Sequence, residues 1–186
     1  MSACRAYTGG MTDTLYRMGL ESPVGFWSLT TTETQALSLD YEGDCLSADM
    51  RVEPETKLEM RLACMLSRYF KGDRVDFSPV PIVFPTSSRF LAEMMRVLKE
   101  VPYGEVHHYQ WLAEAMGNRK AAQAVGGALG RNPLPIIVPC HRIIAKNGSL
   151  GGFMRGASEG SRIKTFLLEL EGVCLGQTPL RRPASR

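Results

Sequence analysis

The residues with the clearest chemical potential lie in one short stretch, Pro139-Cys140-His141-Arg142. Thiolate is the reactive form of cysteine, and a free thiol with a pKa of about 8.5 is mostly protonated at neutral pH. The adjacent imidazole of His141 could accept that proton. Neighbouring side chains on an extended strand point to opposite faces, so the pair either lies on a turn or communicates through a water molecule. The β-branched run 136–138 predicts that the thiol follows a buried strand.

An imidazole that acts as a base needs a third group to orient it, as in catalytic triads. Glu171 is the expected partner, because it closes an apparent C-terminal helix just before Gly172. The structural alternative is a cysteine that merely fills the core, beside a histidine with satisfied hydrogen bonds. The prolines and the arginine that frame the Cys-His pair favour the chemical interpretation.

Two short helices are expected to precede this stretch, at about 109–116 and 119–129, with Gly117-Asn118 as the turn. This pattern predicts a helix-turn-helix. The second helix is rich in small residues, although glycine inside a helix costs about 1 kcal/mol relative to alanine. Either the helix packs closely against another helix, or it approaches a DNA minor groove about 6 Å wide. In the second case Arg119 and Lys120 would contact phosphates.

The first half of the chain predicts a small α/β domain over residues 22–85, after an N-terminal extension, 1–21, without clear periodicity. Strands are expected at 24–30, 34–39 and 80–84, and a turn at 41–44. Apolar spacing predicts a helix at 55–70. Nothing in this half carries obvious chemistry. The second domain, 86–175, opens with a helix that ends near Val101, and a basic tail, 176–186, is expected to be disordered.

The charge of the chain is unevenly distributed. Residues 1–85 hold 8 Lys/Arg against 12 Asp/Glu, whereas residues 86–175 hold 11 against 7. A polyanion would therefore contact the second half. The five cysteines form no CxxC pair and only three histidines are present, so no metal and no cofactor is expected. Without an apolar run long enough for a membrane or a signal peptide, we expect a soluble intracellular protein.

The segment from Asn132 to Ile144 resembles the active-site signature of the O6-alkylguanine-DNA alkyltransferases, also called methylated-DNA–protein-cysteine methyltransferases. The resemblance continues through Tyr103-Gly104-Glu105-Val106, Tyr109-Gln110-Trp111-Leu112-Ala113, Ala124-Val125-Gly126-Gly127-Ala128, Gly151-Gly152-Phe153, and Leu167-Leu168 with Glu171-Gly172. It spans about residues 86–175. Residues 22–85 match more loosely, through Ser22-Pro23-Val24-Gly25 and Tyr69-Phe70-Lys71-Gly72.

The resemblance implies a fold and a reaction. The fold would be an α/β, ribonuclease H-like N-terminal domain and a mainly α-helical C-terminal domain with a helix-turn-helix. The protein would act as a monomer in the cytoplasm, or in the nucleus of a eukaryote. It would bind the minor groove of double-stranded DNA, flip out an O6-alkylguanine and irreversibly take its alkyl group once. The substrate could extend to O4-alkylthymine.

The resemblance also implies roles for individual residues. Cys140 would accept the alkyl group, His141 and Glu171 would draw off its proton through a water, and Tyr109 would protonate the departing guanine at N3. Asn132 would steady the thiolate. Residues 153–156 would form a lid over the base. The substrate and DNA contacts would be Gln123, Arg119, Lys120, Ala124, Gly126, Arg131, Pro135, Arg142, Ile143, Phe153, Met154 and Lys164.

The sequence departs from the family pattern at the second helix, where Gln123 replaces the arginine expected to fill the space of the flipped base. Arg119, one turn earlier, could compensate in part. In the lid, Met154 replaces a frequent serine, and the stretch 157–161 is longer than usual. Two other functions stay open: a lesion-binding module without transfer, which Gln123 favours, and a cysteine hydrolase built on Cys140, His141 and Glu171.

Overall fold

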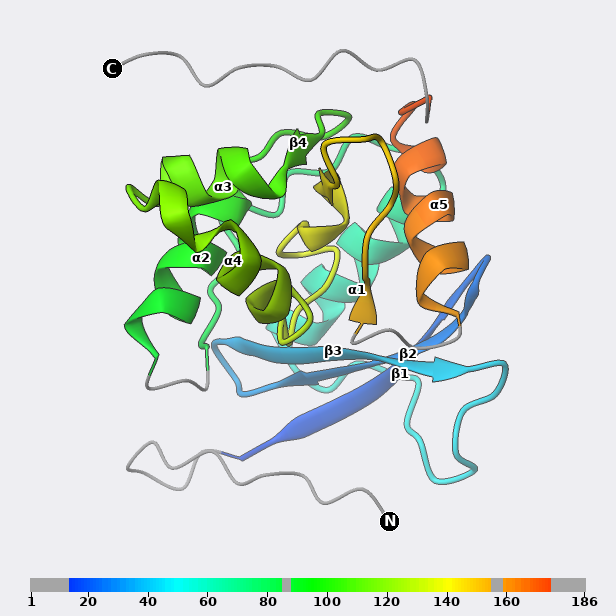
Figure 1. Cartoon of the computed structure of the whole chain (residues 1–186). Helices are drawn as coiled ribbons and strands as arrows, with labels where there is room; N and C mark the ends of the chain where they lie inside the picture. Colours follow the sequence, from blue (N-terminus) through cyan, green and yellow to red (C-terminus); the bar gives the residue numbers. More distant parts are fainter. Residues whose placement is uncertain (1–13, 85–87, 155–158, 175–186) are drawn as a thin grey trace.

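The computed structural model describes residues 14–84, 88–154 and 159–174. Its first elements form a three-stranded antiparallel sheet. Strands β1 (Tyr16–Ser22), β2 (Gly25–Thr31) and β3 (Ala36–Gly43) lie side by side in chain order. Ser22 pairs with Gly25 across the first hairpin, where Gly25 takes a φ of +123° that disfavours other residues. The sheet lies beneath the helices in Figure 1.

The strand predictions were partly wrong. Tyr16–Ser22 is a strand, not part of a loose extension. Its Gly19 lies under the side chains of Leu46 and Met50, a contact that no local pattern reveals. β3 continues through residues 41–43, where a turn was predicted, because Tyr41 packs edge-on against Trp27 with ring centroids 5.3 Å apart. Residues 80–84 contribute only an isolated bridge between Ala36 and Ile82.

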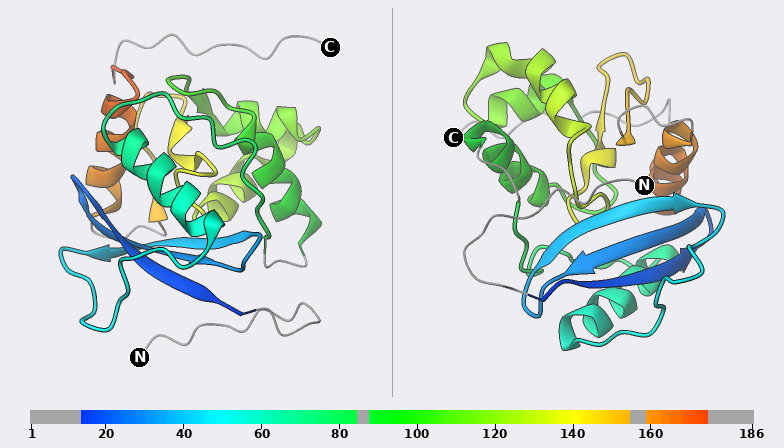
Figure 2. Two further views of the ribbon diagram at one scale, coloured as in Figure 1. Left: turned by 180° about the vertical axis from the view of Figure 1, so that it is seen from behind. Right: turned by 90° about the horizontal axis from the view of Figure 1, so that it is seen from below.

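Helix α1 (Lys57–Phe70) confirms the helix predicted in the first half. Thr56 caps it: its side chain accepts from the backbone N–H of Glu59, and the Glu59 carboxylate accepts from the backbone N–H of Thr56. Its buried face is made by Leu58, Glu59, Leu62, Leu66, Tyr69 and Phe70. Figure 2 shows α1 lying beside the sheet. This packing turns Tyr69, at the end of the helix, toward the second half of the chain.

The second half is mainly helical, as predicted. It contains α2 (Arg89–Lys99), α3 (Tyr109–Ala115), α4 (Ala122–Leu129) and α5 (Gly160–Leu170). A 3-10 turn, Arg119–Ala121, leads into α4, so the predicted second helix begins less regularly than expected. Two short parallel strands, β4 (His107–His108) and β5 (Ile143–Ile144), connect the start of α3 to the segment after Cys140.

One hydrophobic core runs through both halves. Trp27 and Leu29 from the sheet, Leu66 from α1, and Met94 and Leu98 from α2 belong to the same cluster of buried side chains. The methionines of α2 are core residues, as their helical spacing predicted. The backbone N–H of Leu39 also donates to the carbonyl of Pro133, at 2.8 Å. The sheet is therefore attached directly to the segment that leads to Cys140.

Candidate active site

Cys140 lies on a turn rather than at the end of a strand. The prediction of a buried strand over 136–138 is wrong, because Ile136 adopts a φ of +73° and Pro135 forms an isolated bridge with Val138. Cys140–Arg142 then form one turn of 3-10 helix, η2. Residues 136–138 are buried because the turn passes through the core. A buried turn needs the same apolar, β-branched residues as a buried strand, and this composition led to the prediction of a strand. Of the two arrangements predicted for Cys140 and His141, the turn is present.

Asn132 holds the thiol from one side. Its Nδ2 donates to Cys140 Sγ at 3.0 Å and to the Val138 carbonyl at 2.8 Å. Its Oδ1 accepts from the backbone N–H of Leu134 at 3.0 Å, which fixes the orientation of the amide. An amide N–H directed at sulfur stabilises a negative charge there. Asn132 therefore organises the turn and favours the thiolate.

Glu171 is the most heavily hydrogen-bonded group of the site. Its Oε1 accepts from the Tyr69 hydroxyl at 2.7 Å, from His141 Nε2 at 2.8 Å and from an Arg142 guanidinium N–H at 2.8 Å. Its Oε2 accepts from Arg142 Nε at 2.8 Å and from the backbone N–H of Gly104 at 3.0 Å. Burial alone would raise the pKa of this carboxyl, but His141 and Arg142 lower it well below its usual range. Glu171 is therefore a carboxylate.

The bond to Glu171 also selects the tautomer of His141. A carboxylate accepts only, so the hydrogen of the neutral ring lies on Nε2, and Nδ1 carries a lone pair. Nδ1 is buried, and no described group hydrogen-bonds to it. Burial lowers the pKa of His141 despite the nearby carboxylate, so the ring is neutral and can accept a proton. The geometry thus orients the imidazole with an acidic group, as the triad argument predicted.

Burial raises the pKa of the Cys140 thiol, although Asn132 and Lys164 oppose that shift. The resting group is a protonated thiol. Lys164 supplies a compensating charge: its ammonium is buried and donates to the carbonyls of Ile143 and Leu150, at 2.6 and 2.5 Å. Burial lowers the pKa of Lys164 to about 8, so it stays charged at neutral pH. A thiolate at Cys140 would therefore form beside a positive charge.

Tyr109, the first residue of α3, lies close enough to Cys140 for the two groups to interact electrostatically. Burial and the nearby Cys140 raise the pKa of its hydroxyl, which therefore keeps its proton. The hydroxyl touches the chain at Gly151, where a Cβ would lie 2.2 Å from it. Phe153 is buried and Met154 takes a φ of +48°. The rest of the predicted lid, 155–156, and the first two residues of the stretch 157–161 lie outside the described residues, whereas Gly160 and Ser161 already belong to α5.

Two residues predicted to contact the substrate or DNA are enclosed in the protein, Arg142 and Lys164. The guanidinium of Arg142 is buried. It donates to the Glu171 carboxylate and, at 2.6 Å, to the Val101 carbonyl. Lys164 is also enclosed. Both charges are satisfied inside the protein, a condition the sequence could not reveal. Pro135 and Ile143 are buried as well, and contact of these four residues with the substrate or DNA stays a prediction.

The small-residue face of α4 is open to solvent. Gln123, Ala124, Gly126 and Gly127 are exposed, and a Cβ added at Gly127 would meet nothing within 4 Å. The opposite face is buried through Ala121, Val125, Ala128 and Leu129. Close packing against another helix therefore does not explain these glycines. Three flanking side chains that were predicted to contact DNA are exposed too, namely those of Arg119, Lys120 and Arg131.

Tyr69 is the site residue that sequence reasoning missed. It belongs to the first half, which was predicted to carry no chemistry, yet its hydroxyl binds Glu171. Its helical spacing indicated only a core position, and its place in the loose resemblance Tyr69-Phe70-Lys71-Gly72 was the one available signal. A contact across 102 residues cannot be read from local pattern.

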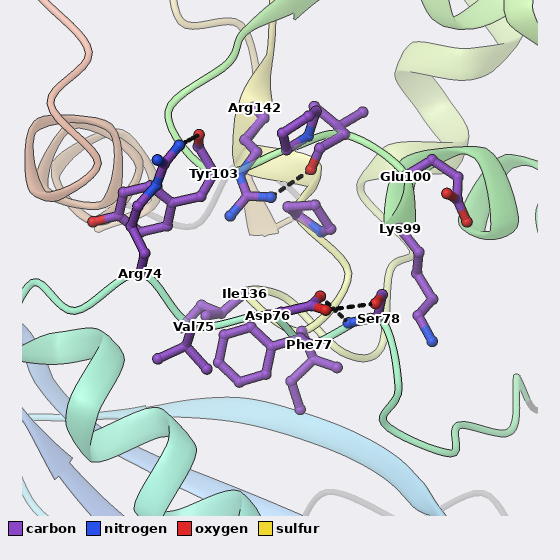
Figure 3. Close-up of a pocket in the computed structure, with 14 residues that line it drawn as sticks. Arg74, Val75, Asp76, Phe77, Ser78, Lys99, Glu100, Tyr103, Ile136 and Arg142 are labelled. Carbon is purple, nitrogen blue, oxygen red and sulfur yellow. Dashed lines mark hydrogen bonds between the residues drawn. The ribbon is translucent and has the colours of Figure 1, made fainter.

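A separate cavity of about 370 Å³ lies behind the active-site turn. Figure 3 shows Val75, Phe77 and Ile136 along one side of this cavity, with Arg142 also among the residues that line it. Cys140 and His141 do not line it. Within the described residues, no three His, Cys, Asp or Glu side chains could hold a metal ion, and no helix is long and apolar enough to cross a membrane.

The fold and the site define a protein with a buried cysteine nucleophile, a His-Glu pair beside it, and an exposed helix of small residues flanked by basic side chains. Residues 89–173 match the family model described as the 6-O-methylguanine DNA methyltransferase, DNA binding domain. The chain is 36% identical to the methylated-DNA–protein-cysteine methyltransferase of Haemophilus influenzae over 163 residues, which cover 86% of this chain and 87% of that protein. It therefore belongs to the methylated-DNA–protein-cysteine methyltransferase family.

Other comparisons agree. The human methylated-DNA–protein-cysteine methyltransferase is 36% identical over 88% of this chain and 84% of its own length. The crystal structure of the Mycobacterium tuberculosis O6-methylguanine methyltransferase superimposes with a TM-score of 0.71, at 30% identity, and covers 85% of this chain and 93% of its own. A structure of the same organism's protein in complex with DNA matches with a TM-score of 0.71, at 31% identity, over 83% of this chain and 91% of its own. These solved structures share the arrangement of sheet and helices described above.

Proposed function

We propose that this protein repairs DNA by direct reversal, moving the alkyl group of O6-alkylguanine onto Cys140 in a single turnover. The observation that carries the proposal is the environment of Cys140: Asn132 donates to its sulfur, and the next residue, His141, is oriented by a buried hydrogen bond to Glu171. Membership of the methyltransferase family supports the same reaction.

The reaction begins with the thiol proton, which passes through a water to Nδ1 of His141. The new imidazolium is stabilised by Glu171, 2.8 Å from Nε2. The sulfur then attacks the alkyl carbon in line with its bond to O6, so an S–C bond forms as the C–O6 bond breaks. The electron pair of the broken bond goes to the guanine, which the Tyr109 hydroxyl protonates at N3. The product thioether has no easy leaving group, so Cys140 is consumed.

Two neighbours stabilise the sulfur before attack. The Asn132 amide, 3.0 Å from Sγ, and the buried ammonium of Lys164 both favour the thiolate. Because burial opposes ionisation, these groups act where a charge would otherwise be costly. A thiol that is protonated at rest is protected from other electrophiles and ionises only in the assembled site.

For DNA binding we infer that α3 and α4 act as a helix-turn-helix whose exposed small residues enter the minor groove. The alkyl carbon is unreachable inside a stacked duplex, so the base must be flipped out, at a cost of a few kcal/mol that a badly paired lesion reduces. Arg119, Lys120 and Arg131 would contact phosphates, and Gln123 would occupy the vacated space without adding charge. The protein would act as a monomer in the cytoplasm, or in the nucleus of a eukaryote.

The test is a mass measurement after incubation with an oligonucleotide that contains O6-methylguanine. We expect the mass of one methyl group on the peptide with Cys140, at no more than one per molecule. Cys140→Ala should gain nothing, whereas Cys64→Ala, at an exposed cysteine of α1, should react like the wild type. Binding without a mass change would indicate a lesion-binding module, and turnover of an ester or amide would indicate a hydrolase; either result contradicts the proposal.

A further inference from the structure

A tyrosine from the first half of the chain completes the buried network around His141. The Tyr69 hydroxyl donates to Glu171 Oε1 at 2.7 Å and lies 3.4 Å from His141 Nε2. Its side chain is fully buried at the end of α1, and it is separated from these partners by 102 and 72 residues. The two groups that it touches are those assigned to proton transfer.

The ring of Tyr69 is held in one orientation. Three aromatic rings contact it edge-on: those of Phe70 and Phe77, each with centroids 5.8 Å away, and that of Tyr103 at 6.1 Å. Such edge-to-face contacts resist rotation of the ring in a packed core. Burial and the adjacent carboxylate raise the pKa of Tyr69 well above its usual value. The hydroxyl is therefore a permanent hydrogen-bond donor with a fixed direction.

Oε1 of Glu171 is shared among three donors, and their directions decide where the oxygen lies. Arg142 binds both carboxylate oxygens and so fixes the plane of the group. Tyr69 and His141 approach the same oxygen, and the 3.4 Å between them leaves the imidazole little freedom to turn. If the Tyr69 hydroxyl were absent, the imidazole of His141 could turn about its hydrogen bond to Glu171 Oε1. Its Nδ1 would then lose its alignment with the Cys140 thiol.

We propose that Tyr69 is a positioning residue for alkyl transfer, through which the N-terminal half of the chain aligns the His141-Glu171 pair that deprotonates Cys140. This inference rests on the proposed function. It gives the α/β half a direct part in the chemistry, in addition to its contribution to the core. It also implies that a movement of α1 would alter the reactivity of a cysteine located on the other half.

The hydroxyl has an electrostatic effect as well. By donating to Oε1 it draws part of the carboxylate charge away from His141. Without it, that charge acts more fully on the imidazole and favours the protonated ring. Alkyl transfer requires the neutral ring, so the acidic limb of the pH–rate profile should move to higher pH.

The experiment is single-turnover alkyl transfer by full-length Tyr69→Phe, with an oligonucleotide containing O6-methylguanine and, separately, with a free O6-alkylguanine base. We expect transfer to slow about tenfold with both substrates, because the defect lies in the thiol chemistry. The dissociation constant for the oligonucleotide should stay within about twofold of the wild type. The acidic limb of the pH–rate profile should move to higher pH by about half a unit.

Tyr103→Phe is the matched control. Its hydroxyl belongs to the same aromatic cluster but donates to the main-chain carbonyl of Leu170, at 2.9 Å. The Tyr103→Phe variant should lose about as much thermal stability as Tyr69→Phe. It should keep the wild-type rate of transfer and the wild-type pH–rate profile. If Tyr69→Phe gave the same rate and profile as Tyr103→Phe, or a limb moved to lower pH, the positioning role would be overturned. A wild-type protein that took up no methyl group would instead overturn the proposed function.

Discussion

Glu171→Gln is the perturbation that tests the site most directly. The substitution keeps the size of the side chain and removes its charge. The carboxylate oxygens accept five hydrogen bonds, from Tyr69, His141, Gly104 and twice from Arg142. An amide has one accepting oxygen, and its NH2 group would face at least two donors at the other position. The variant also leaves a buried guanidinium without its counter-charge.

The magnitude follows from this arrangement. Removing one partner of a buried ion pair costs about 3–5 kcal/mol, because the other charge stays desolvated. For a chain of this size that corresponds to a fall in Tm of about 6–20 °C. Loss of the group that orients and stabilises a general base should slow alkyl transfer about 100-fold. Both effects have one cause, so they should appear together.

Thermal unfolding and single-turnover transfer measure the two effects. Glu169→Gln, an exposed position on α5, is the control and should change the free energy of unfolding by less than about 0.5 kcal/mol. Folding lowers the pKa of Glu171, so its contribution to stability is present above the unfolded pKa of about 4.3 and is lost as the pH falls below it. The difference in the free energy of unfolding between Glu171→Gln and the wild type should therefore become smaller as the pH is lowered. An unchanged Tm at neutral pH would refute the argument that Glu171 balances Arg142.

Three further predictions concern the sulfur and the DNA-binding face. The rate of transfer should fall above about pH 8, where Lys164 loses its proton. Lys164→Met should react slowly and should lack this basic limb of the pH–rate profile. A basic limb unchanged in the variant would show that Lys164 does not stabilise the thiolate. Asn132→Ala should lower the free energy of unfolding by about 1–3 kcal/mol, because the backbone N–H of Leu134 loses its acceptor and the Val138 carbonyl loses one of its two donors. The same variant should slow alkylation of Cys140 by the free base as well as by DNA. Gln123→Arg should speed repair of duplex lesions more than reaction with the free base; equal effects on both would contradict a role in base flipping.

Local patterns predicted the helices well and the strands poorly. α1 and α2 carry apolar residues at helical spacing and begin at capping residues, so their signals lie within the segment itself. β1 has no such signal, because its pairing partner and the side chains that cover Gly19 lie elsewhere in the chain. The run 136–138 misled for the same reason: burial is a tertiary property, and a buried turn has the same composition as a buried strand.

The sequence by itself determined the kind of chemistry. Cys140 beside His141, the expected partner Glu171, and a helix of small residues near basic side chains could be identified from residue types and spacing. Only the tertiary structure decided how these groups act. It placed Arg142 and Lys164 inside as counter-charges, exposed one face of α4 and brought Tyr69 to Glu171 from the other half of the chain. The physical reason is that pKa values, hydrogen-bond partners and exposure depend on groups brought together by folding, and no local pattern encodes those neighbours.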